Sequence, residues 1–307
     1  MQDMKRVAVL RGGTSSDYEA SMSTGNAVLS ALLGSPYPHR DIVITKSGDW
    51  LTGGRRITPD QALEGIDVLF ITLQGDQEQD STIQKILERK RIPYTGSKVL
   101  AAGFARNKEL AKQTMRSAGI QTPKHRRIGQ SEKHEIRQEL EQIILDLGSS
   151  LYLKPLFSKS PASYRSVQEA HELEGNLVEM LDMYDDLLVE ETVSGIPAQV
   201  GVLANFRGQD LYTLPANELA HDYVRPGRFS PVVKTELARV AKLAHQAVGC
   251  SQYSLTDCMV NGDEVVFLKI DSCPALDITH HYAVSAESIG LSHRDLIYHL
   301  ITTAIIK

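Results

Sequence analysis

The stretch Ile92-Pro93-Tyr94-Thr95-Gly96-Ser97 closes the first third of the chain and fixes the order of the segments around it. A strand-like apolar run, 68–73, and a short helix-like segment, 81–88, come before it, and a helix rich in alanine and glycine follows it. The chain opens with an apolar strand, 7–10, and the turn Arg11-Gly12-Gly13. Strands that alternate with helices predict a parallel sheet with crossover helices in this first part.

The remaining two thirds of the chain predict two further units that mix helices and strands. Helices are expected at 107–118, 134–147, 231–248 and 293–306. Strands are expected at 151–155, 187–191, 198–205, 253–260 and 264–270. The last two strands are joined by Asn261-Gly262-Asp263, which is typical of a hairpin turn. An antiparallel sheet is therefore expected near the end of the chain.

The order of these segments, from Arg11-Gly12-Gly13 to Asp271-Ser272-Cys273-Pro274, closely resembles the D-alanine–D-alanine ligases of the ATP-grasp superfamily. The resemblance runs almost end to end and implies an α/β and α+β fold of three units. These are an N-terminal Rossmann-like domain with a parallel sheet (1–96), a central small ATP-grasp domain (97–188) and a C-terminal ATP-grasp domain (189–307).

Bulk composition narrows the classes of function. The chain has 307 residues with 42% hydrophobic and 23% charged residues, which is ordinary for a globular protein of two or three domains. The formal charge of −5 argues against general binding to nucleic acid or to an anionic membrane. No apolar run is long enough to span a bilayer. Three cysteines without metal-type spacing fit free thiols, so we expect a cytoplasmic location.

The resemblance assigns roles to five residues. Lys108 and Lys154 fall where the family places two lysines on the phosphates of ATP, and Glu190 falls on an acidic position beside the adenine. Glu19 matches the family glutamate that orients the first amino acid, and Ser160 matches a substrate serine. For Glu19, the alternative is a glutamate in a first helical turn that interacts with the helix dipole.

The segment after Lys154 departs from the family. The family has a glycine- and serine-rich loop here, because backbone N–H groups must approach the phosphates closely. Residues 155–165 contain no glycine, and Pro161 has no amide donor. A changed loop that still binds phosphate through Lys159 and Arg165 is the alternative. A second departure is Pro197, which replaces a ribose-binding glutamate.

The metal site also departs from the family. Leu255 stands where the family has an arginine, and Lys269 replaces a glutamate that bridges two Mg²⁺ ions. Asp257 and Asp271 remain, so one weak magnesium site is conceivable. We expect the Lys269 ammonium to replace the metal and to reach Asp257 or Asp271, since alternation places residues 269 and 271 on one face. The alternative is a lysine that points to solvent.

Three functions follow from this pattern. The first is an active ligase that makes D-alanyl-D-alanine for peptidoglycan. The second, which the substitutions favour together, is a ligase-like protein that keeps the fold but has little or no ligase activity. The third is an ATP-grasp enzyme with a different acceptor. The expected ligands are a nucleotide such as ATP and a D-amino acid, with Mg²⁺ disfavoured by Lys269, and the resemblance implies a homodimer.

Overall fold

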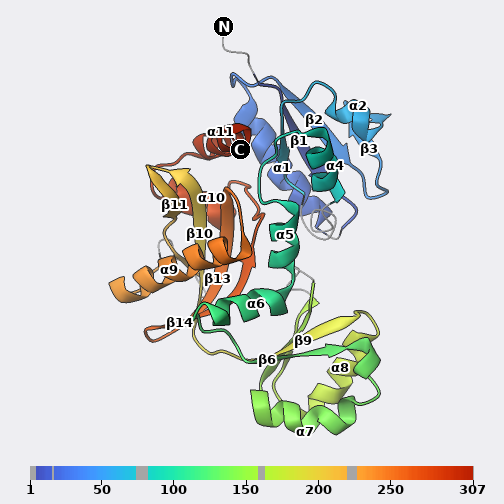
Figure 1. Cartoon of the computed structure of the whole chain (residues 1–307), viewed down its shortest axis with the longest axis vertical. Coiled ribbons are helices and arrows are strands. Elements are labelled where there is room, and N and C mark those ends of the chain that lie inside the picture. Colours follow the sequence, from blue (N-terminus) through green and yellow to red (C-terminus); the bar gives the residue numbers. More distant parts are fainter. Residues whose placement is uncertain (1–4, 16, 74–81, 158–162, 220–226, 307) are drawn as a thin grey trace.

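A computed structural model describes residues 5–15, 17–73, 82–157, 163–219 and 227–306 of the protein. Figure 1 shows three groups of elements, each built on its own sheet. The first and third groups lie next to each other, whereas the central group, with α7 (Ile136–Leu147) and α8 (Leu173–Leu181), forms the far end of the molecule (Figure 1).

The first sheet has the strand order β4-β3-β2-β1-β5, and β1 runs parallel to both β2 and β5. Its strands are β1 (Val7–Gly12), β2 (His39–Ile44), β3 (Trp50–Thr52), β4 (Arg55–Ile57) and β5 (Val68–Ile71). Its helices are α1 (Tyr18–Leu32), α2 (Pro59–Leu63) and α4 (Thr82–Lys90). Alternation along β1 builds two cores. Val7 and Val9 pack with α1 and with the last helix, and Ala8 and Leu10 pack on the opposite face.

The segment 92–97 lies beside β5 and joins the first group to the third. The Leu69 amide donates to the Pro93 carbonyl at 2.9 Å, and the Thr95 amide donates to the Leu69 carbonyl at 3.0 Å. The Gly96 amide then donates to Gln252 Oε1 at 2.6 Å in the third group. Residues 92–97 therefore connect the first sheet to the third group through hydrogen bonds of their backbone groups.

The central sheet has the order β6-β9-β7-β8 and is antiparallel throughout. Its elements are β6 (His125–Gly129), α7 (Ile136–Leu147), β7 (Leu151–Pro155), β8 (Arg165–Val167), α8 (Leu173–Leu181) and β9 (Asp186–Glu191). The apolar sides of α7 and α8 pack against β7 and β9 in one buried cluster. This sheet therefore has a core of its own.

The third sheet has the order β11-β10-β13-β14, and the short β12 also pairs with β10. Its strands are β10 (Ile196–Phe206), β11 (Gln209–Thr213), β12 (Asn217–Glu218), β13 (Tyr253–Asn261) and β14 (Glu264–Asp271). The remaining helices are α5 (Val99–Arg106), α6 (Lys108–Ser117), α9 (Pro231–Val248), α10 (His281–Glu287) and α11 (His293–Ile306). Ala111 and Met115 of α6 share a core with α9 and with this sheet.

Two connections link the central group to the rest of the chain, one from α6 to β6 and one from β9 to β10. They lie side by side, because the Lys124 amide donates to Glu191 Oε1 at 2.8 Å and the Glu191 amide donates to the Lys124 carbonyl at 3.0 Å. We call this pair of connections, residues 118–124 and 192–195, the paired connection.

The structure confirms most of the predicted elements and the predicted mixture of α/β and α+β. The strand 151–155 and the helices 231–248 and 293–306 match within a residue, and the hairpin at residues 261–264 is present. Several short elements, among them β3, β4, β8 and α10, were not predicted from the sequence. The boundaries at residues 96 and 188 stay predictions.

Candidate functional site

A cavity of about 230 Å³ lies between the central and third sheets. It is lined by residues of α6, β7, β9, β13 and β14 and of nearby loops: Lys108, Lys112, Pro123, Tyr152, Lys154, Tyr164, Glu190, Glu191, Val193, Asp257, Met259, Leu268 and Lys269. Four of these residues are lysines and three are carboxylates. The structure thus brings Lys108, Lys154, Glu190, Asp257 and Lys269 of the sequence prediction around one cavity.

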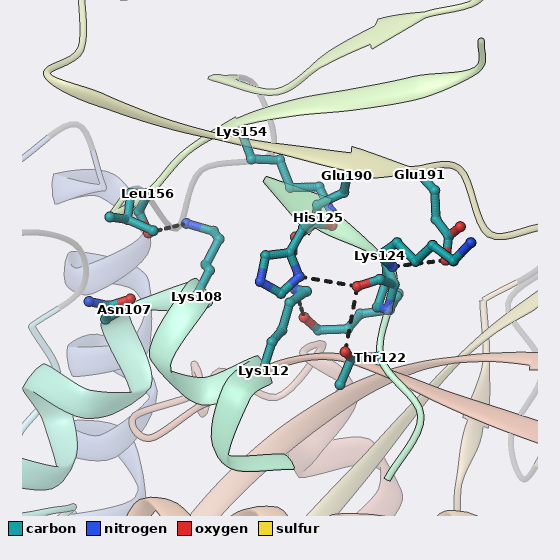
Figure 2. A network of polar contacts seen from close by, with 12 residues as sticks. Asn107, Lys108, Lys112, Thr122, Lys124, His125, Lys154, Leu156, Glu190 and Glu191 are labelled. Atoms are coloured by element: carbon teal, nitrogen blue, oxygen red, sulfur yellow. Dashed lines mark hydrogen bonds and ion pairs between the residues drawn. The ribbon is translucent and has the colours of Figure 1, made fainter. Parts of the chain in front are cut away.

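The helix α6 presents two lysines to this cavity. The Asn107 side chain caps the helix by accepting from the Leu110 amide at 3.0 Å. Lys108 and Lys112 are four residues apart and therefore lie on the same side of the helix. Figure 2 shows both lysines extending from α6 toward the strands of the central sheet.

Glu190 on β9 is the buried anion at the centre of the lysines. Lys112 Nζ lies 2.8 Å from Glu190 Oε1, and both side chains are 1% exposed. Lys154 pairs with the other carboxylate oxygen (Figure 2). Burial by itself raises the pKa of Glu190, but the ammonium groups of Lys112 and Lys154 lower it to about 2. Glu190 is therefore a fixed negative charge at neutral pH.

Lys108 is buried beside other cations. Its ammonium donates to the carbonyls of Pro155 at 2.9 Å and Leu156 at 3.2 Å. Burial, followed by the charges of Lys112 and Lys269, lowers the pKa of Lys108 to about 7, although Glu190 opposes the shift. Lys108 therefore titrates in the physiological range, and an anion placed in the cavity would favour its charged form.

Two tyrosine rings form the aromatic part of the cavity. Lys154 Nζ lies 5.5 Å from the centre of the Tyr152 ring and 5.6 Å from that of Tyr164, and Lys108 Nζ lies 5.7 Å from Tyr164. These distances are within the range of cation–π attraction. Burial raises the pKa of Tyr164, so its hydroxyl stays protonated. The rings help to hold the lysines in place.

At the other end of the cavity, β13 and β14 bring Asp257 and Lys269 together. The two residues are direct cross-strand partners, and Lys269 Nζ lies 3.3 Å from Asp257 Oδ2. The predicted contact between Lys269 and an aspartate is therefore confirmed. Asp271 lies opposite Leu255 in the register, and its carboxylate accepts from the Cys273 amide at 2.9 Å. Asp271 does not line the cavity.

The other predicted site residues lie elsewhere or outside the described residues. Glu19 sits in the first turn of α1, is exposed and pairs with Lys46 at 3.2 Å; it does not line the cavity. Leu255 is buried in the core that includes α11. Ser160, with Lys159 and Pro161, falls in 158–162, outside the described residues. The catalytic roles of Glu19 and Ser160 stay predictions.

Two site residues, Lys112 and Gln199, were not predicted from the sequence. The signal for Lys112 was its position one helical turn after Lys108, which puts both lysines on one side of the helix. Gln199 is a polar residue between apolar neighbours in β10, and its amide donates to Asp257 Oδ1 at 2.8 Å. A polar side chain in such a strand usually has a hydrogen-bond partner.

The chain has a lysine-lined cavity between two α+β groups and a further sheet in which β2, β1 and β5 are parallel and β3 and β4 antiparallel, which matches an ATP-grasp fold. The family model for the C-terminal part of D-alanine–D-alanine ligases, "D-ala D-ala ligase C-terminus", matches residues 114–302, more than half of the chain. The chain belongs to the D-alanine–D-alanine ligase family.

Relatives and solved structures agree with this assignment. The chain is similar to the D-alanine–D-alanine ligase of Geobacter sulfurreducens, with 30% identity over 98% of this chain and 95% of the relative. For the ligase of Syntrophobacter fumaroxidans, the identity is 31% over 97% of each chain.

No helix in the described ranges has both the length and the apolar character needed to cross a membrane.

Three solved structures share the fold. The D-alanine–D-alanine ligase of Coxiella burnetii superposes with a TM-score of 0.88 at 22% identity, covering 99% of this chain and 94% of that one. The VanG D-Ala:D-Ser ligase of Enterococcus faecalis gives 0.85 at 23% identity, with 98% and 100% covered. The D-alanine–D-alanine ligase of Bacillus anthracis, solved with ATP, gives 0.81 at 22% identity, with 98% and 97% covered.

Proposed function

We propose that this protein binds ATP in the cavity of about 230 Å³ and uses it to join the carboxylate of one small molecule to the amine of another. The observation that carries the proposal is the convergence of Lys108 and Lys112 of helix α6 and Lys154 of strand β7 on one cavity. A polyphosphate is an anion that such a group of ammonium ions attracts. Met259 and Leu268 give the same cavity an apolar wall on which a base can pack.

The reaction proposed is that of the family. A carboxylate oxygen attacks the γ-phosphorus of ATP, ADP leaves, and an acyl phosphate forms. The amine then attacks the acyl carbon, and phosphate leaves as the new amide bond forms. Negative charge grows on phosphoryl and carbonyl oxygens in both steps, and fixed ammonium groups stabilise it. D-Alanine is the first substrate to test, since relatives of the chain carry the name D-alanine–D-alanine ligase.

Turnover is tested by ADP release. We expect the protein with ATP and D-alanine to release ADP and to form a dipeptide, at a rate within the usual range of about 1–10³ per second. Lys154→Met should lower this rate about tenfold or more, because it removes a charge-assisted contact from the cavity. Lys85→Met changes an exposed lysine of α4 and serves as the control. ADP release that does not depend on an added amino acid would contradict the proposal.

A second candidate is a ligase-like protein that binds nucleotide with little or no turnover. Leu255 at the position of the family arginine and the Lys269–Asp257 ion pair favour it. Membership of the family fits an active ligase at least as well. Calorimetry separates the two candidates, because the second predicts heat of nucleotide binding without ADP release in the presence of D-alanine.

Nucleotide affinity should depend on pH through Lys108. Its pKa of about 7 means that it is largely neutral at pH 8 and above in the free protein. Bound phosphate favours the ammonium form, so binding takes up a proton, and affinity should fall by up to about tenfold per pH unit above pH 8. The charged groups that act on Lys108 are Lys112, Lys154, Lys269 and Glu190. Calorimetry in two buffers with different ionisation enthalpies measures this proton uptake. If nucleotide binding takes up no proton at pH 8, Lys108 is not the group that sets the pH dependence.

A role in peptidoglycan synthesis, a cytoplasmic location and a homodimer are further parts of the proposal. Each rests on the resemblance to the ligases. Sedimentation equilibrium of the purified protein tests the homodimer, for which a mass of twice 33.9 kDa is expected.

A further inference from the structure

A row of polar side chains crosses the third sheet at the end of the cavity. In the strand register, Gln199 on β10 lies opposite Asp257 on β13, and Asp257 lies opposite Lys269 on β14. Side chains that lie directly opposite in antiparallel strands share a face and come within contact distance. The row therefore sits on one face of the sheet, with Asp257 and Lys269 lining the cavity.

Both carboxylate oxygens of Asp257 have partners in this row. Oδ1 accepts from Gln199 Nε2 at 2.8 Å, and Oδ2 lies 3.3 Å from Lys269 Nζ. Gln199 is oriented in turn, since its Oε1 contacts Nδ1 of His281 at the start of α10. The negative charge of Asp257 raises the pKa of Lys269, so that Lys269 carries a full positive charge. The row thus holds a fixed ammonium beside a fixed carboxylate.

These residues do not fit the magnesium ions that the ATP-grasp ligases use. Mg²⁺ requires oxygen ligands in octahedral geometry at about 2.0–2.1 Å. An ammonium offers donors only, and it repels a divalent cation that approaches the same carboxylate. Among the residues that the structure describes, no group of three or more His, Cys, Asp and Glu side chains could hold a metal ion. By the resemblance to the ligases, Lys269 stands where the family has a second carboxylate for the metal.

We infer that this protein binds the polyphosphate of its nucleotide without a divalent cation, with Lys269 supplying positive charge at the end of the cavity. An ammonium has three donors and contacts Asp257, and the Lys269 side chain keeps 36% exposure at the cavity wall. Lys269 thus offers further donors to phosphate oxygens from a position that Asp257 and Gln199 fix. The inference rests on the proposed nucleotide binding, which it deepens.

The first test compares nucleotide binding with and without metal. ATP and ADP are titrated into the full-length protein by calorimetry, once with a chelator and once with excess Mg²⁺. We expect affinities that differ by no more than about threefold between the two conditions. Lys269→Met removes the charge and keeps an unbranched side chain, and it should weaken binding about tenfold or more in both conditions. Lys234→Met changes an exposed lysine of α9 and should leave affinity unchanged.

The second test converts the site. Lys269→Glu places a second carboxylate directly opposite Asp257, and it should create Mg²⁺ binding that is measurable by titration with the metal alone. Nucleotide affinity in this variant should then rise about tenfold or more on addition of Mg²⁺. Lys234→Glu makes the same change of charge outside the cavity and should show neither effect. Urea unfolding shows whether each variant is folded, and Lys269→Met keeps the test valid if Lys269→Glu does not fold.

The outcomes separate this inference from the proposed function. Nucleotide binding by the unmodified protein that requires Mg²⁺ would overturn the inference and leave the proposed function standing. An unchanged affinity for ATP and ADP in the folded Lys269→Met variant would also overturn the inference. If neither ATP nor ADP binds with or without metal, the proposed function fails and the inference fails with it.

Discussion

Glu190→Gln should lower the free energy of unfolding by about 3–5 kcal/mol, which is the usual cost of removing one partner from a buried ion pair. Glu190 and Lys112 are each 1% exposed, and Lys154 contacts the same carboxylate. A neutral amide in this position leaves two ammonium groups close together with Lys112 still buried. Their repulsion and the lost attraction act in the same direction, so the effect is large for one substitution. Urea unfolding at pH 7 measures it.

The loss of unfolding free energy in Glu190→Gln should depend on pH, and this dependence provides an internal check. The pKa of Glu190 is lowered to about 2 by Lys112 and Lys154, against the effect of burial. Its contribution to stability is therefore present above the unfolded-state pKa of about 4.5 and is lost as the pH falls toward 2. The gap in stability between the unmodified protein and the variant should narrow over this window. Glu141→Gln, an exposed site on α7, is the control, and equal losses in both variants would contradict the argument.

Gly12→Ala should destabilise the first sheet by about 4 kcal/mol or more, in the range of exceptional single substitutions. Gly12 ends β1 with φ of +88°, a conformation that costs energy for any residue with a Cβ. A Cβ at this position would also lie 2.1 Å from the Ile44 carbonyl oxygen on the neighbouring strand. A backbone atom of a paired strand cannot move aside without breaking the pairing between β1 and β2.

Gly48→Ala separates the cost of the backbone conformation from the cost of the contact with Ile44. Gly48 has a similar φ of +86°, but a Cβ there would meet only the Thr14 side chain, at 3.8 Å. This variant should therefore show the cost of the backbone conformation alone, about 1–3 kcal/mol. Urea unfolding of both variants measures the difference. Equal losses at the two sites would show that the contact with Ile44 relaxes without cost.

The order of the longer elements was predictable because these strands and helices carry local signals. The apolar run at Val68–Ile71 and the turn before Glu264 illustrate this, since periodicity and turn residues act within a few neighbours. The pairing of Asp257 with Lys269 was predictable for the same reason, because a two-stranded hairpin brings its own residues together. The hairpin at one end of the cavity follows from such signals, whereas the three-unit fold was expected from the resemblance to the ligases.

The rest of the cavity depends on contacts between distant segments. Lys112 meets Glu190 only because α6 packs on the third sheet while β9 belongs to the central one. Gln199 reaches Asp257 because β10, rather than β14 alone, borders β13. No local pattern in the sequence states which strands become neighbours or which helix faces which sheet. The partner of each buried charge was therefore known only from the structure.

The paired connection would act as a pivot in any movement of the central group against the third group. The Lys124 and Glu191 hydrogen bonds place its two chain segments next to each other at the edge of the cavity, and the central sheet extends from them with α7 and α8 farthest away (Figure 1). In a rotation about a pivot, displacement grows with distance from the pivot. Bending there would carry α7 and α8 through a wide arc while residues beside the pivot, including Glu190, shift little.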